Sequence, residues 1–301
     1  MIELRGLTKR YGATAAVDDL TATVAPGVVT GFLGPNGAGK STTMRLILGL
    51  DRPTAGTATI DGRAYRSLRR PLHQVGALLD ARALAPSRSV RAHLRWIAAA
   101  NGIARSRVEA VLGQVGLDGV ADRRAGTLSL GMCQRLGIAA ALLGDPPVLL
   151  FDEPVNGLDP EGIRWVRTLM RELAGQGRTV LVSSHLLAEM ADTADALLVI
   201  GRGRLVAATS VADFVAGAAG AAVRVRSPQR DRLRAALTEA GIGVADDGDA
   251  LLVTGADTDT VGELAAARGL VLHELSARAP SLEQAYLQVT DAVTDYRSGA
   301  S

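Results

Sequence analysis

The sequence predicts an α/β protein built around a phosphate-binding loop, followed by a smaller α+β unit. Three observations support this fold class. The glycine-rich segment Gly34–Ser41 lies between a strand pattern and a helix pattern. Apolar strand-like runs then alternate with helical patterns as far as residue 200, which is typical of a mostly parallel, covered sheet. A run of Ala and Gly at 216–222 separates this part from a second set of strands and helices.

The phosphate-binding loop matches the pattern G-x-x-x-x-G-K-[ST] at every position of Gly34–Ser41. A buried strand is expected at Val28–Leu33 and the first turns of a helix at Thr42–Leu48. Glycines let successive backbone N–H groups form an anion nest, and the helix N-terminus adds partial positive charge. Lys40 is expected to reach the β- and γ-phosphates, and the Ser41 hydroxyl to ligate Mg²⁺. The loop residues expected to contact a nucleoside triphosphate are Gly34, Pro35, Asn36, Gly37, Ala38, Gly39, Lys40, Ser41 and Thr42.

Bulk composition narrows the function classes. The chain has 301 residues, 48% of them apolar, enough for one large domain and a small one with sizeable cores. A formal net charge of +2 gives no electrostatic reason to expect a nucleic-acid partner. The single cysteine, Cys133, excludes an internal disulfide and fits a reducing cytoplasm. Neither a signal-peptide core nor about 18 uninterrupted apolar residues occurs, so any membrane role is expected to need a partner protein.

Domain boundaries follow from the element pattern. Helical patterns at 90–100, 106–115 and 129–143 are interpreted as a helical insertion at about 80–144 within the α/β core. Strand patterns of the core are expected at 2–8, 17–24, 57–60, 74–79, 148–151, 179–183 and 196–200, with helices at about 160–174 and 186–193. The predicted organisation is a nucleotide-binding domain at 1–215, a linker at 216–222, a C-terminal unit at 223–290 and a tail at 291–301.

The C-terminal unit is expected to be ferredoxin-like, because its pattern has the order β-α-β-β-α-β with an extra helix. The predicted strands are 223–226, 242–245, 250–254 and 270–275, and the predicted helices are 229–240, 257–268 and 281–289.

Paired carboxylates follow an apolar strand pattern at Val148–Phe151. Asp152 and Glu153 should emerge at the carboxyl edge of the sheet, where phosphate-loop ligands bind. Asp152 is suited to hold Mg²⁺ through its water shell, and Glu153 to polarise the water that attacks the γ-phosphate. Taken alone, the pair could equally be two solvated loop acids before Pro154; the phosphate loop favours the catalytic interpretation.

A second phosphate-binding device is predicted at Leu128–Met132, where Ser129 is a natural N-cap of the following helix. Plain helix capping would explain this segment by itself. Because one phosphate loop does not need two such devices, the redundancy suggests that this segment contacts the nucleotide of a second copy of the chain.

The order of these motifs resembles the nucleotide-binding subunit of ABC transporters over residues 1–215. Its motifs are the phosphate loop, Leu128-Ser-Leu-Gly-Met132, the acids at 152–153, Asn156-Gly-Leu-Asp159 and Ser184-His185. The C-terminal unit, with Pro280-Ser-Leu-Glu-Gln-Ala-Tyr-Leu287, is similar to the appendage of ATP-binding subunits of bacterial ABC-2-type exporters, including the daunorubicin-resistance kind.

The resemblance implies further roles. Tyr11 would stack on adenine, Glu153 would be the catalytic base and His185 would bond the γ-phosphate. Ser129 and Gly131 would close on the ATP held by the other subunit, and Asp159 would lie at the subunit interface.

Two positions depart from the family pattern. Asp80 stands where the family usually has Gln, so a Mg²⁺ role there is an open expectation, and Leu130 stands where Gly is common.

The function implied is an ATPase that uses ATP and Mg²⁺, dimerises around ATP and powers export through a separate membrane-spanning permease of the ABC-2 type. Its expected location is the cytoplasmic face of the cell membrane. Two alternatives remain at this stage: an ATPase of the same fold acting on the ribosome or DNA, and a nucleotide-gated interaction module that hardly hydrolyses ATP.

Overall fold

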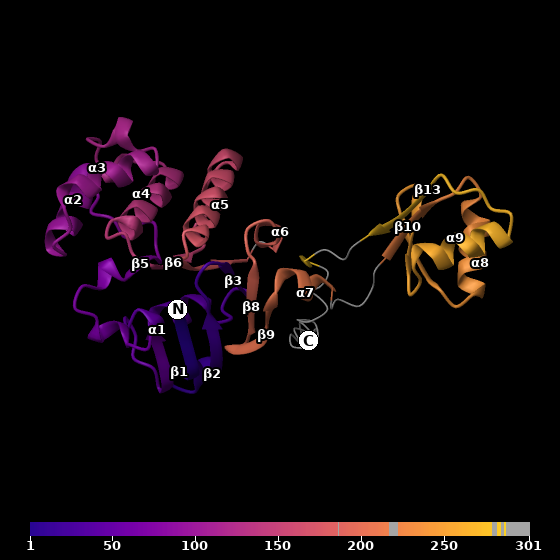
Figure 1. Cartoon of the computed structure of the whole chain (residues 1–301), viewed down its shortest axis with the longest axis horizontal. Helices are drawn as coiled ribbons and strands as arrows, with labels where there is room; N and C mark the ends of the chain where they lie inside the picture. The colour runs from indigo at the N-terminus through magenta and orange to yellow at the C-terminus, as the bar shows by residue number, and fades with distance from the viewer. Residues whose placement is uncertain (186, 217–221, 279–281, 284–285, 287–301) are drawn as a thin grey trace, which may run out of the picture. The chain divides into compact units, whose positions relative to one another are not determined.

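The computed structural model describes residues 1–185, 187–216, 222–278, 282, 283 and 286 (Figure 1). The chain divides into two compact units, 1–210 and 211–301, and each is described by itself. Among the described residues, no helix has both the length and the apolar character needed to cross a bilayer. The predicted linker core 217–221, the tail 291–301 and most of the predicted helix 281–289 lie outside the described residues.

The first unit contains two sheets and the helices that pack on them. Its strands are β1 (Ile2–Tyr11), β2 (Thr14–Val24), β3 (Val29–Leu33), β4 (Ala55–Ile60), β5 (Val75–Leu78), β6 (Val148–Asp152), β7 (Thr179–Ser184), β8 (Ala196–Gly201) and β9 (Arg204–Ser210). Its helices are α1 (Lys40–Ile47), α2 (Val90–Ala100), α3 (Arg105–Gln114), α4 (Leu130–Leu142), α5 (Pro160–Gly175) and α6 (Leu187–Ala191).

The larger sheet has the strand order β5-β6-β7-β3-β8-β9, in which only β9 runs antiparallel to its neighbour. Strands β3 and β7 are buried along their whole length, as strands in a parallel sheet covered on both faces should be, although β7 also buries Thr179, Ser183 and Ser184. The predicted mostly parallel sheet is confirmed. Strand β9 was not predicted. It follows β8 through Arg202 and Gly203, whose positive φ angles of 49° and 80° form a tight hairpin.

The smaller sheet, β2-β1-β4, is antiparallel throughout. After β4, Asp61 and Gly62 adopt φ angles of 47° and 75° and bring Arg63 back beside Ile60, which is the hairpin-like turn expected there. Helix α1 belongs to a buried cluster that contains side chains from both sheets, including Leu7, Leu20, Phe32, Met44, Ile47, Leu150 and Leu181. This shared core fixes the loop that precedes α1 against the larger sheet.

The three helices of the predicted insertion, α2, α3 and α4, lie together (Figure 1). Helix α4 approaches β5 closely because both elements have glycine at the contact. A Cβ on Gly76 would lie 2.0 Å from the Ala141 carbonyl oxygen, and one on Gly137 would lie 2.5 Å from a Leu78 methyl group. Backbone-to-backbone packing at this point attaches the helical segment to the edge of the sheet.

The second unit begins with α7 (Val211–Ala216), which was not predicted. Its further strands are β10 (Ala222–Arg226), β11 (Gly243–Asp247), β12 (Ala250–Thr254) and β13 (Glu274–Arg278), and its further helices are α8 (Arg230–Glu239) and α9 (Thr258–Ala267). The strands form an antiparallel sheet in the order β11-β12-β10-β13. The chain therefore follows the expected order β-α-β-β-α-β.

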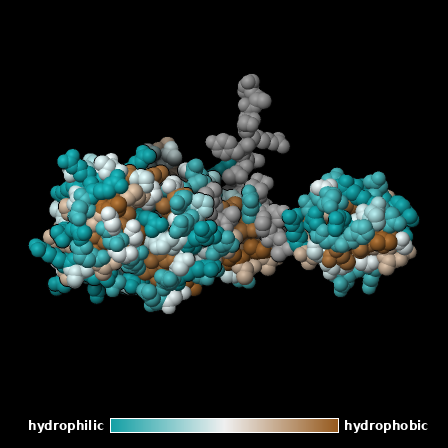
Figure 2. All heavy atoms as spheres, turned by 90° about the horizontal axis from the view of Figure 1, so that it is seen from above, coloured by the Kyte–Doolittle hydropathy of each residue, from teal (hydrophilic) through white to brown (hydrophobic). Residues whose placement is uncertain are grey.

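The side chains of β10 alternate between an apolar face and a charged face of this sheet. Val223 and Val225 join the buried cluster with Leu233 and Leu237 of α8. Between them, Arg224 contacts the carboxylates of Asp247, Asp249 and Glu274. Hydrophilic side chains accordingly cover much of the visible surface of this unit (Figure 2).

The last strand was predicted four residues too early, at 270–275 instead of Glu274–Arg278. Leu270 and Leu272, which suggested a strand, pack on the apolar cluster instead. The Val271 N–H donates to the Gln229 side chain at 3.0 Å, so this segment crosses toward the sheet before pairing with β10 begins.

Replacing Gly76 with Ala should lower the free energy of unfolding of the first unit by about 1–3 kcal/mol, because the new methyl would overlap the Ala141 carbonyl and push α4 off β5. The matched control is Gly113→Ala in α3, where a Cβ meets open space and stability should rise by up to about 1 kcal/mol. Urea unfolding measures both. Equal stability of the Gly76→Ala and wild-type proteins would contradict the packing argument.

Candidate functional site

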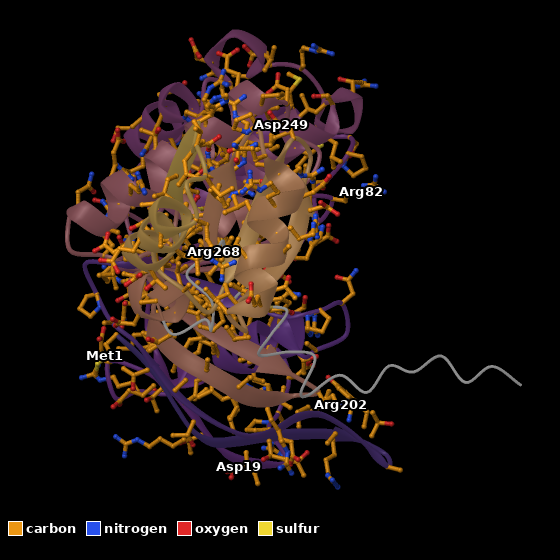
Figure 3. All side chains as sticks on the ribbon, turned by 90° about the vertical axis from the view of Figure 1, so that its right-hand side faces the viewer. Met1, Asp19, Arg82, Arg202, Asp249 and Arg268 are labelled. Atoms are coloured by element: carbon orange, nitrogen blue, oxygen red, sulfur yellow. The ribbon has the colours of Figure 1, made fainter. Side chains whose placement is uncertain are left out.

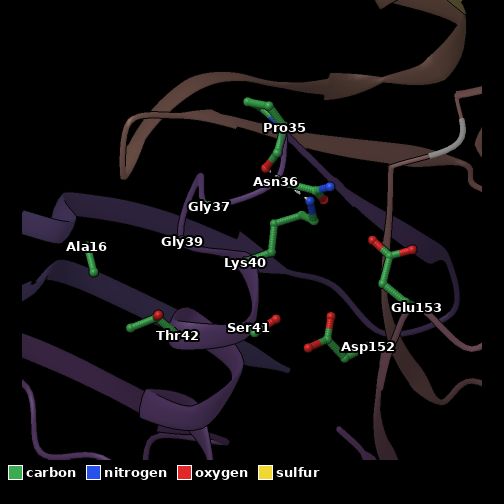
Figure 4. Close-up of a pocket in the computed structure, with 10 residues that line it drawn as sticks. All are labelled: Ala16, Pro35, Asn36, Gly37, Gly39, Lys40, Ser41, Thr42, Asp152 and Glu153. Atoms are coloured by element: carbon green, nitrogen blue, oxygen red, sulfur yellow. Dashed lines mark hydrogen bonds between the residues drawn. The ribbon is translucent and has the colours of Figure 1, made fainter. Parts of the chain in front are cut away.

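The principal candidate site is a hollow of about 210 Å³ beside the loop that joins β3 to α1 (Figure 4). It is lined by Ala16, Pro35, Asn36, Gly37, Gly39, Lys40, Ser41, Thr42, Asp152 and Glu153. The structure thus brings together the phosphate loop and the two acids that the sequence singled out. Lys40 and Ser41 lie on one side, and Asp152 and Glu153 at the end of β6 face them across the hollow.

Two of the loop glycines are required by close backbone contacts. A Cβ on Gly34 would lie 2.5 Å from the Ile200 carbonyl oxygen, and one on Gly39 would lie 2.3 Å from that of Ala16. Gly39 also has φ +107°, a conformation that residues with side chains rarely adopt. The loop is therefore held against β2 and β8 with its backbone exposed toward the hollow.

Lys40 is the first residue of α1, and its side chain turns back over the loop. Its Nζ donates to the Gly34 carbonyl at 2.6 Å and to the Pro35 carbonyl at 3.3 Å. The residue is only 7% exposed, and this burial lowers the pKa of its ammonium, against the opposing effect of Glu153 and Asp152. The loop thus holds a desolvated cation where an anionic phosphate would provide it with a stronger partner.

The two acids at the end of β6 have different surroundings. The Asp152 carboxylate accepts a hydrogen bond from the Ser183 hydroxyl. Glu153 Oε2 lies 2.7 Å from His185 Nδ1, and the Glu153 backbone has φ +49°. That left-handed conformation costs a non-glycine residue roughly 1–2 kcal/mol. Backbone strain and a histidine partner on one glutamate at the mouth of a phosphate loop are features expected of a catalytic group.

The donors at this site suit Mg²⁺. The Ser41 hydroxyl and the Asp152 carboxylate both line the hollow and supply hard oxygen ligands. Within the described part of the chain, no group of three or more His, Cys, Asp or Glu side chains could form a complete metal cage. This combination fits Mg²⁺, which typically keeps several waters and binds one or two carboxylates together with substrate phosphates.

Asp80, the other predicted metal ligand, is not among the residues that line the hollow. It follows the end of β5, and its carboxylate accepts the backbone N–H of Arg82 at 2.8 Å. The Arg82 side chain lies at the periphery of the protein (Figure 3). In this conformation, Asp80 stabilises a local turn, and its metal role stays a prediction.

Tyr11 lies at the tip of the β1–β2 hairpin and is 52% exposed. Its hydroxyl donates to Asp51 at 3.2 Å, and the Lys9 ammonium lies 4.9 Å from the centre of its ring. Tyr11 does not line the hollow, but these two contacts hold an exposed aromatic ring in one orientation, as a stacking surface requires.

A second hollow, of about 280 Å³, contains the remaining predicted residues. It is lined by Ser129, Leu130, Gly131, Met132, Arg135, Gly157, Leu158 and Asp159. Ser129 caps α4 as predicted, accepting the Met132 N–H at 3.2 Å, and Asp159 caps α5 by accepting the Gly162 N–H at 2.8 Å. The two segments interlock, because a Cβ on Gly157 would lie 2.2 Å from a Leu130 methyl group.

Several residues at these sites were missed by sequence reasoning, among them Arg135 in the second hollow. Ala16 lines the principal hollow, and Ser183 contacts both acids. The Gln134 side chain donates to the carbonyls of Glu153 and Asn156 at 3.3 and 3.2 Å, tying α4 to the loop after β6. No motif identifies these residues, because their roles depend on which elements are adjacent.

A phosphate loop facing paired acids at the carboxyl edge of a parallel sheet defines a P-loop nucleoside triphosphatase. Family comparison identifies the branch: residues 17–156 match the model described as ABC transporter, and 221–283 match one described as a domain of unknown function. The chain belongs to the family of ABC transporter ATP-binding proteins.

Relatives and solved structures are similar to this chain over about two thirds of its length or more. The chain is 38% identical over 216 residues to the uncharacterized ABC transporter ATP-binding protein YhcH of Bacillus subtilis, covering 71% of each chain. It is 40% identical over 208 residues to the bacitracin transport ATP-binding protein BcrA of Bacillus licheniformis, covering 68% of each. The solved structure of an ATP-binding subunit of an ABC transporter is 30% identical, with a TM-score of 0.65, covering 71% of this chain and 91% of that one.

Replacing Gly39 with Ala should abolish measurable ATP binding, because the methyl group would collide with the Ala16 carbonyl and displace the phosphate loop. Gly27→Ala is the matched control, since Gly27 also has a positive φ, of +81°, but a Cβ there meets open space away from the hollow. Both variants should lose roughly 1–2 kcal/mol of stability from backbone strain. Titration with a fluorescent ATP analogue tests this, and wild-type affinity in Gly39→Ala would contradict it.

Proposed function

We propose that this chain is the ATP-hydrolysing subunit of a membrane exporter and works as a dimer around ATP. The observation that carries the proposal is the meeting of Lys40 and Ser41 with Asp152 and Glu153 in one hollow, with His185 bonded to Glu153. These groups supply a phosphate cradle, metal ligands and a base within one site.

In the binding step, the backbone N–H groups of the phosphate loop and the α1 N-terminus bind the phosphates. The Lys40 ammonium exchanges its carbonyl partners for phosphate oxygens. The Ser41 hydroxyl and the Asp152 carboxylate would hold Mg²⁺, and the bound ion would neutralise phosphate charge. Tyr11 stacks on the adenine ring, since its orientation is already fixed by Asp51 and Lys9.

In the hydrolytic step, Glu153 orients the attacking water and accepts its proton. His185 holds the Glu153 carboxylate through the 2.7 Å contact and is positioned to bond the γ-phosphate. Ser183 lies at the buried end of β7 and the exposed His185 directly follows the strand, so one stretch of chain contacts both the base and its neighbouring acid.

We propose that the second hollow meets the ATP held by another copy of the chain. Ser129 and Gly131 at the start of α4 supply a hydroxyl and backbone N–H groups there, and Asp159 lies beside them. These groups lie in a separate hollow from the chain's own phosphate loop, which is the arrangement that two chains sharing two nucleotides require.

The exporter assignment rests on relatives named for bacitracin and lantibiotic transport, which are 40% and 34% identical to this chain. We propose an ABC-2-type permease as the partner and the cytoplasmic face of the membrane as the location. The segment of α2, α3 and α4 is proposed to face the permease. The ribosome- or DNA-associated alternative is not supported by these relatives, and no nucleic-acid partner is proposed.

For the C-terminal unit we propose a ferredoxin-like fold, supported by the antiparallel strand order β11-β12-β10-β13 and the helices after β10 and β12. We propose that the nucleotide-binding domain spans 1–215 and this unit 223–290, with a linker between them at 216–222. The division into compact units falls five residues earlier, after Ser210, because α7 belongs to the second unit.

Glu153→Gln should retain ATP binding, lower ATP hydrolysis by at least about 100-fold and accumulate an ATP-bound dimer, since the amide cannot accept the proton. Phosphate release and light scattering after size-exclusion chromatography measure the two effects. The matched control is Glu161→Gln in the first turn of α5, which should hydrolyse ATP at the wild-type rate. Turnover in Glu153→Gln above a tenth of the wild-type rate would refute the base assignment.

Affinity purification of the chain from detergent-solubilised membranes of its host should recover a polytopic membrane protein in stoichiometric amount. Mass spectrometry identifies the partner, and the Glu153→Gln variant with ATP should increase its recovery. Recovery of only ribosomal or DNA-associated proteins would leave the ATPase assignment standing and overturn the exporter proposal.

A further inference from the structure

Ser183 was given no role by the sequence, yet it contacts both acids of the site. It is the next-to-last residue of β7 and is fully buried. In the parallel pairing of β6 with β7, Asp152 pairs with Ser183 in the last registered position. Ser183 therefore stands where β6 leaves the sheet and the catalytic loop begins.

The Ser183 hydroxyl makes two hydrogen bonds, one as acceptor and one as donor. Its oxygen accepts the Glu153 backbone N–H at 2.9 Å, and its proton is donated to Asp152 Oδ1. The first contact satisfies the backbone N–H of Glu153, which follows the last strand pair, Asp152 and Ser183, and has a φ angle of +49°. The second occupies one carboxylate oxygen of Asp152, so that the side chain has a fixed rotation and its other oxygen is presented to the hollow.

We propose that Ser183 is a positioning residue that sets the geometry of both acids at once. One hydroxyl fixes the Asp152 carboxylate as a metal ligand and fixes the strained Glu153 backbone from which the base projects. This inference rests on the proposed ATPase function and deepens it, because it links metal binding and proton transfer to a single group. Removing the hydroxyl is expected to impair both, whereas a change in packing alone would impair neither selectively.

Two variants, Ser183→Ala and Ser183→Cys, test whether the loss of the hydroxyl or a change in packing impairs the site. Alanine deletes the hydroxyl, and cysteine keeps a polar side chain of similar shape whose S–H is a weak donor and weak acceptor. The matched control is Thr179→Val at the other end of β7, which removes a hydroxyl from a residue only 1% exposed and distant from the acids. Circular dichroism and the thermal unfolding midpoint of all three nucleotide-free proteins establish that they fold.

Two measurements are made on the full chain. Steady-state phosphate release is recorded as a function of Mg²⁺ at saturating ATP, giving kcat and the half-saturating Mg²⁺ concentration. Mn²⁺ binding in the presence of ADP is measured by electron paramagnetic resonance, which does not depend on turnover. Both Ser183 variants should have a kcat about 10-fold lower than the wild type. They should also need about 10-fold more Mg²⁺ for half-saturation and bind Mn²⁺ about 10-fold more weakly, the size of effect found when the partner of a metal-binding carboxylate is removed. Thr179→Val should match the wild type.

The outcomes distinguish this inference from the function on which it rests. If the wild type hydrolyses ATP and both folded Ser183 variants keep its kcat and metal dependence, the positioning role is refuted and the ATPase function stands. If the Thr179→Val control loses as much as Ser183→Ala, the effect is general to the strand and the positioning role is also refuted. If the wild type neither binds nor hydrolyses ATP with Mg²⁺, the proposed function fails and the inference fails with it.

Discussion

The parallel pairing of β6, β7 and β3 is the constraint on which the rest of the site depends. In this ladder, Asp152 pairs with Ser183, and Leu33 pairs with Ser184, so three strands end together at one edge. The carboxyl ends of parallel strands lie at the same edge of a sheet. The phosphate loop after β3 and the acids at the end of β6 therefore lie close together in space, although they are far apart in the sequence. Burial of the apolar side chains of these strands stabilises that edge of the sheet.

Two features of the site are costly in the nucleotide-free chain. Lys40 is buried with carbonyl partners, and Glu153 has a left-handed backbone. Such features persist only where the surrounding structure is rigid. Here the rigidity comes from the shared core of α1 and the two sheets, together with the hydroxyl of Ser183. The strain is concentrated at the residues proposed to act on the nucleotide, and those residues will gain new partners when phosphate binds.

The second hollow is attached to the loop that carries the acids of the principal one. Gln134 ties α4 to the carbonyls of Glu153 and Asn156, and Leu130 packs over Gly157. The segment proposed to meet the partner's ATP is thus physically attached to the loop that follows the chain's own acids. Leu130 departs from the glycine common in the family, and its side chain is one half of this contact. The attachment gives the proposed dimer a direct structural connection between its two sites.

Sequence patterns alone were enough to predict the phosphate loop, the acids at 152–153, the parallel α/β class and the β-α-β-β-α-β order of the C-terminal unit. These features are local: they depend on glycine spacing, apolar periodicity and capping residues, which are encoded over a few positions. The sequence missed β9 and α7 and placed β13 too early, because Leu270 and Leu272 are apolar for packing and not for pairing. The structure was needed to show that Ser183, Gln134 and Ala16 belong to the sites. The hydrogen-bond partners of Gln134 and Ser183 lie 19 to 31 residues away in the chain, and Ala16 lines the hollow together with residues between 35 and 153. Strand register and helix packing bring these residues together, and no local pattern encodes that.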